Sequence, residues 1–224
     1  MAMLVAIEGA DGAGKNSAAT RLCDEFNAAG RRATVIAFPR YGETVAGLTL
    51  GKFLAGELPL PVTTEAAAVL YALDRLESAQ VIADAAAAHE IVLFDRYTAS
   101  NMAYQAAKVT GEDASALMHW ILRLEREQFA LPPADLTIYL DTPWVVAREL
   151  ILRKRQRSYT DRSYDEHEAD AQLQLRVRDA YARMADEGLG GRWHVVHSCR
   201  DGALRPPADI TAEIRAEIDR LFPD

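Results

Sequence analysis

A glycine-rich segment near the start of the chain constrains its fold more than any other feature. The segment, residues 9–15, follows the apolar run 4–7 and precedes a stretch with helical spacing. Gly9, four further residues, and then Gly14 and Lys15 form the spacing of a phosphate-binding loop between a strand and a helix. Backbone N–H groups and the helix N-terminus bind phosphate oxygens in such a loop, and the lysine adds positive charge. The predicted nucleotide-phosphate site comprises Gly9, Ala10, Asp11, Gly12, Ala13, Gly14, Lys15, Asn16 and Ser17.

The loop departs from the usual pattern at one position. Asn16 stands where a serine or threonine hydroxyl usually contacts Mg²⁺, and Ser17 comes one residue too late. An amide is a poorer ligand than a hydroxyl in that position, so we expect the metal to depend on Asp11, Asp95 and water. The alternative, a glycine-rich turn with a surface lysine, does not require the strand and helix that flank this segment.

Short apolar runs alternate with helical patterns along the rest of the chain. Alternation of this kind predicts βαβ units and an α/β fold: one domain, residues 1–224, with a five-stranded parallel sheet covered by helices on both faces. Ligands of such folds bind at the carboxyl ends of the strands. The predicted strands are 4–7, 34–37, 91–94, 136–140 and 193–196, and the predicted helices are about 15–28, 65–88, 99–108, 113–129, 143–155, 169–187 and 208–221.

Charge and cysteine content narrow the class of protein. The net charge is −8, which argues against general nucleic-acid binding, because that rests on many Lys and Arg. The only cysteines, Cys23 and Cys199, form no metal-binding or disulfide spacing. The apolar N-terminal stretch lacks a basic region and is too short for a signal peptide, and no apolar run reaches membrane-spanning length. We therefore expect a soluble, cytoplasmic protein.

Two strand ends carry arginines. Arg40 follows the second predicted strand, and Asp95 and Arg96 follow the third. An arginine at such a position can bind phosphate oxygens, and a carboxylate can hold Mg²⁺ or its water. A solvated loop arginine and a helix-capping Asp beside its neighbour are the alternatives.

Two helices present polar side chains at helical spacing. Tyr71 and Arg75 are four residues apart, so they share one helix face, where a ring could stack on a base and a guanidinium could bind its edge. Ser100, Asn101 and Tyr104 share a face of the next helix and could also contact a nucleoside. Read alone, the first pattern favours a core tyrosine with a surface salt bridge, and the second favours an ordinary polar helix face.

A basic segment stands out in this acidic chain. Arg153, Arg155, Arg157 and Arg162 lie in it, and an acidic stretch that includes Glu168 follows. A loop with several arginines could close over ATP and neutralise charge in the transition state. A solvated helix C-terminus, where cations interact well with the helix dipole, is the alternative.

Taken together, these segments resemble bacterial thymidylate kinase, a family of P-loop nucleoside monophosphate kinases. The order and spacing match over essentially the whole chain, and the set is far more specific than any single motif. The segments are residues 8–15, 38–41, 71–75 and 95–97, then Ser100, Asn101 and Tyr104, and the late segment 177–181.

The resemblance implies a role for each site residue. Arg40 and Arg96 would bind the phosphate of dTMP, Tyr71 would stack on thymine, and Tyr104 would disfavour ribonucleotides. Arg75 and Asn101 would read the base edge. The implied dTMP site comprises Asp11, Phe38, Arg40, Tyr41, Tyr71, Arg75, Arg96, Ser100, Asn101 and Tyr104. The implied catalytic residues are Asp11, Lys15, Arg96, Arg153 and Arg157, and the implied metal ligands are Asp11, Asp95 and Glu168. The implied lid, about 153–165, carries Arg153, Arg155, Arg157 and Arg162.

The resemblance also implies the reaction and the assembly. The chain would transfer the γ-phosphoryl group of ATP to dTMP with Mg²⁺, giving ADP and dTDP for dTTP synthesis, as a homodimer built by packing helices. It further implies a cis bond between Phe38 and Pro39. Three alternatives stay open: a deoxynucleoside or UMP–CMP kinase, a GTPase-like switch, although no Asn-Lys-x-Asp motif occurs, and a nucleotide-binding protein without catalysis.

Overall fold

The central element of the structure is a five-stranded parallel sheet. A computed structural model describes residues 2–109, 111–157 and 170–223, with only the backbone for 154–157. The strands of this sheet are β1 (Met3–Glu8), β2 (Ala33–Ala37), β3 (Ile91–Asp95), β4 (Leu136–Asp141) and β5 (Trp193–His197). Their order is β2-β3-β1-β4-β5, and every neighbouring pair is parallel. The predicted α/β fold is confirmed, and β1, which leads into the phosphate loop, lies at the centre of the sheet.

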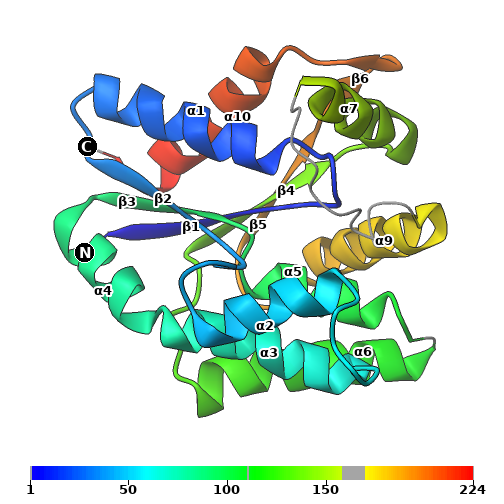
Figure 1. The fold of residues 1–224 in the computed structure, drawn as a ribbon. Coiled ribbons are helices and arrows are strands. Elements are labelled where there is room, and N and C mark those ends of the chain that lie inside the picture. Colours follow the sequence, from blue (N-terminus) through cyan, green and yellow to red (C-terminus); the bar gives the residue numbers. More distant parts are fainter. Residues whose placement is uncertain (1, 110, 158–169, 224) are drawn as a thin grey trace.

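Helices cover both faces of the sheet. Figure 1 shows α1 and α10 on one face, with α3, α5 and α9 on the other. The helices are α1 (Lys15–Ala28), α2 (Val45–Leu54), α3 (Thr64–Glu77), α4 (Ala79–Ala88), α5 (Thr98–Ala106), α6 (Glu112–Arg123), its π-helical continuation η1 (Leu124–Gln128), α7 (Trp144–Arg157), α9 (Ala171–Glu187) and α10 (Pro207–Leu221); a two-stranded ribbon joins β6 (Cys199–Arg200) and β7 (Ala203–Leu204).

The core explains why the central strand β1 is apolar at consecutive positions. Val5 and Ile7 of β1 pack in one cluster with α1 and α10, whereas Leu4 and Ala6 pack on the opposite face with Ile82 of α4. Strands buried on both faces need no polar alternation. Within the described part of the chain, no helix has the length and apolarity that a membrane crossing needs.

Two features differ from the helices that we predicted. The single helix predicted over 65–88 is two helices, α3 and α4, which meet at Ser78. The Ser78 hydroxyl donates to the Asp74 carbonyl at 2.7 Å, and a serine that bonds its own backbone competes with helical pairing. The prediction also missed α2, whose N-cap is Thr44, because Gly47 and Gly51 made this segment read as a loop.

Candidate functional site

The phosphate loop joins β1 to α1 at the carboxyl edge of the sheet. Gly12 has a φ of 77°, and a Cβ added there would lie 2.4 Å from the carbonyl oxygen of Ala147 in α7, so only glycine fits. Lys15 is buried, and its ammonium donates to the carbonyls of Gly9 at 2.9 Å and Ala10 at 2.7 Å. Burial and the nearby charge of Arg96 lower the pKa of Lys15 to about 7. The lysine thus lies within the loop, as phosphate binding requires.

Asp11 connects the phosphate loop to β3 and α9. Its carboxylate pairs with Arg96, which follows β3, and accepts a hydrogen bond from the Gln174 amide at 2.8 Å. The Asp11 backbone N–H donates to the Gln174 side-chain oxygen at 3.1 Å. Burial alone would raise the pKa of Asp11, but the charges of Arg96 and Lys15 hold it below its usual value. Asp11 is therefore a fixed anion beside two cations.

Arg96 has an unusual backbone conformation, with a φ of 69°. Non-glycine residues seldom adopt positive φ, and such strain gathers at functional sites. Its guanidinium lies 5.3 Å from the ring centroid of Tyr104 and donates to the Ser100 hydroxyl at 3.3 Å. Three of the predicted site residues, Arg96, Ser100 and Tyr104, therefore lie together.

Ser100 belongs to a buried network around Glu8. The Glu8 carboxylate is fully buried at the end of β1 and accepts hydrogen bonds from the hydroxyls of Ser100, at 2.6 Å, and Tyr181, at 2.9 Å. It also accepts the backbone N–H of Tyr97 at 2.8 Å. This network fixes the N-terminal turn of α5 against β1.

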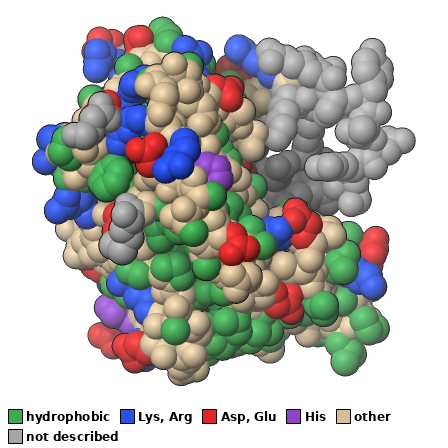
Figure 2. Space-filling view, turned by 90° about the vertical axis from the view of Figure 1, so that its left-hand side faces the viewer, with side chains coloured by type: hydrophobic (Ala, Val, Ile, Leu, Met, Phe, Trp, Pro, Cys, Tyr) green, Lys and Arg blue, Asp and Glu red, His purple; other side chains and the backbone are tan. Residues whose placement is uncertain are grey.

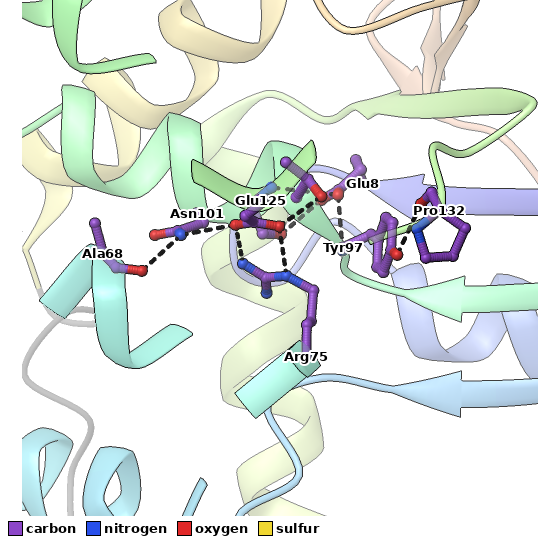
Figure 3. A network of polar contacts seen from close by, with 9 residues as sticks. Glu8, Ala68, Arg75, Tyr97, Asn101, Glu125 and Pro132 are labelled. Atoms are coloured by element: carbon purple, nitrogen blue, oxygen red, sulfur yellow. Dashed lines mark hydrogen bonds and ion pairs between the residues drawn. The ribbon is translucent and has the colours of Figure 1, made fainter. Parts of the chain in front are cut away.

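A second buried carboxylate, Glu125 of η1, lies among the predicted base-reading residues. It accepts two hydrogen bonds from Arg75 and one each from Thr98, at 2.7 Å, and Asn101, at 3.0 Å (Figure 3). Burial disfavours the charged form of Arg75, but the neighbouring Glu125 carboxylate raises the pKa of Arg75 above its usual value. Arg75 is thus buried and ion-paired, not the surface salt bridge considered from the sequence.

The loop after β2 places Arg40. Its backbone N–H donates to the buried carboxylate of Asp74 at 3.0 Å, and its guanidinium pairs with Glu43. The peptide bond between Phe38 and Pro39 is cis, as the resemblance implies. Phe38 packs in the core, with its ring centroid 6.0 Å from that of Tyr97, whereas Tyr41 is exposed. Tyr71 is half-buried on α3.

The predicted metal ligands are only partly described. Asp95 ends β3, and its carboxylate accepts no hydrogen bond from the described residues, whereas both carboxylate oxygens of Asp11 are engaged. Asn16 is exposed in the first turn of α1. The described residues contain no cluster of three or more His, Cys, Asp or Glu for a metal. Mg²⁺ at phosphoryl-transfer sites binds one or two carboxylates plus substrate phosphates, so a free Asp95 carboxylate fits it. Glu168 lies outside the described residues.

The predicted lid is described only at its start. Arg153 is exposed on α7, with a nitrogen 3.6 Å from the Glu149 carboxylate. The side chains of Arg155 and Arg157 are outside the described set, as is the whole of Arg162.

Sequence reasoning missed three buried polar residues that support the site: Glu8, Glu125 and Gln174. Each is buried and polar, and each bonds to partners that are distant in the sequence, 163 residues away for Gln174 and Asp11. The spacing of neighbouring residues does not predict a contact between residues so distant in the sequence. The only signal is a polar residue within a strand or helix pattern that is otherwise apolar.

Comparisons with known proteins agree with this geometry. The family described as thymidylate kinase matches residues 7–200. Thymidylate kinase of Mycobacterium tuberculosis is 41% identical over 213 residues, which cover 92% of this chain and 98% of that protein. Thymidylate kinase of Leifsonia xyli is 34% identical over 219 residues, with 97% and 94% covered. The solved structure of thymidylate kinase from Candida albicans has the same fold, with a TM-score of 0.71, 22% identity, and 98% and 92% covered. The chain belongs to the thymidylate kinase family.

Proposed function

We propose that Lys15, Asp11 and Arg96 carry out the reaction of this family, the phosphorylation of dTMP to dTDP, with ATP as donor. The observation that carries the proposal is their meeting at one point: the phosphate loop supplies Lys15 and Asp11, Arg96 directly follows β3, and Asp11 pairs with Arg96. A phosphoryl group passing between two anionic substrates needs cations that are already in place. Lys15 and Arg96 meet that need.

The chemical step then rests on positioning. ATP binds with its phosphates in the loop, and dTMP binds with its phosphate toward the γ-phosphate. A dTMP phosphate oxygen attacks in line, and the bond from the γ-phosphorus to the bridging oxygen of ADP breaks. The attacking oxygen is already anionic near neutral pH, so no side chain has to remove a proton. Holding the reacting atoms in line supplies much of the rate enhancement.

The nucleoside contacts follow the roles that the resemblance implies. Arg40 and Arg96 bind the dTMP phosphate; Tyr71 stacks on thymine; Tyr104 crowds the 2′ position. Arg75 and Asn101 read the base edge, and both are buried at one place between α3 and α5. Phe38, Tyr41 and Ser100 complete the walls of the site.

We assign Mg²⁺ to Asp95, with Asp11 and Glu168 as further ligands. When bound, the ion would neutralise the charge that develops on the phosphates during transfer. Asp95 has the free carboxylate that such an ion needs, whereas Asp11 is held by Arg96 and Gln174. Glu168 would contribute from just beyond the lid, and the lid residues Arg153 and Arg157 would neutralise charge on the phosphates.

Dimerisation and location complete the proposal. We infer a homodimer from the family and from the apolar side chains that α2 exposes, including Val45 and Leu48. Both cysteines are free; a reducing compartment such as the cytoplasm would keep them so.

A coupled assay of ADP release tests the function. ATP and Mg²⁺ are combined with dTMP, dUMP, dCMP, UMP, AMP, GMP or thymidine. We expect turnover with dTMP to exceed that with every other acceptor. Preference for another monophosphate would keep the kinase but refute the base-reading roles. ATP binding by the folded protein without acceptor-dependent ADP release would favour a switch or a non-catalytic protein.

A further inference from the structure

Glu125 occupies a widened turn of helix beside the predicted base site. The backbone N–H of Phe129 bonds to the carbonyl of Leu124 at 3.0 Å, five residues back, which defines the π-helical turn η1. Such turns recur at functional sites. The Glu125 side chain is fully buried, so its carboxylate acts only on the residues that touch it.

The carboxylate fixes which way the Asn101 amide faces. An ionised carboxylate only accepts hydrogen bonds, so the amide group that contacts it must be the donor. The Asn101 nitrogen donates to Glu125 at 3.0 Å and to the Ala68 carbonyl at 2.9 Å, and both partners are acceptors. A flipped amide would put its oxygen against two other oxygens. The orientation is therefore set by the network and not by the side chain's own preference.

The fixed amide leaves one acceptor uncommitted. The Asn101 oxygen is buried and receives no hydrogen bond from any described residue. Figure 3 shows it on the side of the amide that faces away from Glu125. An unpartnered buried carbonyl costs free energy, unless a ligand supplies the donor.

Arg75 supplies a hydrogen-bond donor to complement the Asn101 oxygen, which is an acceptor. Two of its nitrogens, Nε and Nη2, donate to Glu125. The third, Nη1, can only donate, because a guanidinium has no acceptor. The pair therefore offers one acceptor and one donor. Thymine offers an N3–H donor beside the O4 acceptor, whereas cytosine offers an N3 acceptor beside an amino donor.

We propose that Glu125 is a specificity-determining positioning residue, which makes the base site complementary to thymine and mismatched to cytosine by holding the Asn101 oxygen and Arg75 Nη1 toward the base. The inference rests on the proposed function, in which Asn101 and Arg75 face the base. Glu125 itself does not touch the substrate.

The decisive variant is Glu125→Gln in the full-length protein. A glutamine amide can donate to the Asn101 oxygen, which lets the Asn101 amide turn and present its nitrogen to the base. Steady-state kinetics with dTMP and dCMP give the ratio of their kcat/KM values. We expect this ratio to fall by about tenfold or more, mainly through a higher KM for dTMP. A ratio equal to that of the wild type would overturn the proposal.

Two further variants separate polarity from packing. Glu125→Asp keeps an acceptor-only group and should retain the preference for dTMP, even where overall affinity falls. Glu8→Gln removes an equally buried carboxylate whose network does not include Asn101. We expect Glu8→Gln to lower the melting temperature without lowering the ratio. A ratio lowered equally by Glu8→Gln would show a structural effect only.

The remaining variants guard against instability and against failure of the base-site assignment. If Glu125→Gln does not fold, the double variant Arg75→Met/Glu125→Gln removes the ion pair as a unit. Its dTMP-to-dCMP ratio of kcat/KM should fall below that of Arg75→Met alone. Equal ratios in these two variants would overturn the proposal. Asn101→Ala tests the assignment itself. Unchanged dTMP kinetics in Asn101→Ala would refute the base site, whereas impaired kinetics there with an unchanged ratio in Glu125→Gln would refute only the role of Glu125.

Discussion

At the scale of single residues, Lys15 shows how a charged group is kept ready inside the protein. Its ammonium is buried, and two carbonyls of its own loop accept its hydrogen bonds. The two carbonyls accept hydrogen bonds from the same ammonium that would bind phosphate oxygens. When ATP binds, we expect the more negative phosphate oxygens to replace these carbonyls as acceptors.

Replacing this lysine should separate catalysis from folding. We expect Lys15→Ala to lower kcat by about 100-fold or more, because a preorganised charge next to the transferred group is lost. The melting temperature should change little, since the variant also removes a costly buried charge. Lys52→Ala, at an exposed position of α2, is the matched control and should keep wild-type turnover. Near-normal kcat in Lys15→Ala would refute the assignment.

The same lysine predicts a pH dependence of ATP binding. Burial and Arg96 lower the pKa of Lys15 from 10.5 to about 7 in the free protein. The bound polyphosphate stabilises the charged form and raises that pKa, so binding takes up a proton at pH values above about 7. ATP affinity should therefore fall as pH rises from about 7 to 9. Calorimetry in buffers of different ionisation enthalpy measures the uptake; no uptake at pH 8 would contradict the prediction.

At the scale of elements, α2 positions the loop that carries Arg40. The backbone of Gly47 lies so close to this loop that a Cβ there would be 2.2 Å from the Arg40 carbonyl oxygen. The Thr44 side chain caps the same turn by accepting the Gly47 N–H at 2.8 Å. The helix and the predicted phosphate ligand are thus held as one unit.

Two alanine substitutions in α2 test this close approach. Gly47→Ala should lower the free energy of unfolding by about 1–3 kcal/mol and raise the KM for dTMP, because the backbone must move away from Arg40. Gly51→Ala is the control, since its Cβ would meet only the Tyr41 ring at 3.7 Å. There, alanine should stabilise the helix by about 0.5–1 kcal/mol. Urea unfolding measures both values, and equal effects would argue against the close approach.

Sequence reasoning succeeded where the pattern is local. The phosphate loop is read from residues 9–15 alone, and the five strands are short, mostly apolar runs, so both were predictable. The helix α2 was missed because two glycines hide its apolar spacing, and Ser78 divides a pattern that reads as one helix. The roles of Glu125 and Gln174 could not be predicted, because they depend on contacts that exist only in the folded chain.

At the scale of the whole molecule, apolar side chains gather on one side. Figure 2 shows them over the lower half of the face in view, the part of the molecule that holds α2, α3 and α4. Val45 is 72% exposed and Leu48 is 53% exposed on α2. They are three residues apart, so they share one helix face. Clustered exposed apolar side chains of this kind mark surfaces that other proteins cover.

The predicted homodimer gives this face a partner, a second copy of the chain. We expect light scattering at micromolar concentration to give twice the chain mass of 24.7 kDa. Leu48→Glu should give the single-chain mass, because burying unpaired carboxylates at the interface costs more than the apolar contact gains. Leu204→Glu, on β7 at the other end of the molecule, is the control and should stay dimeric. A dimeric Leu48→Glu would place the interface elsewhere, and a monomeric wild type would refute the dimer itself.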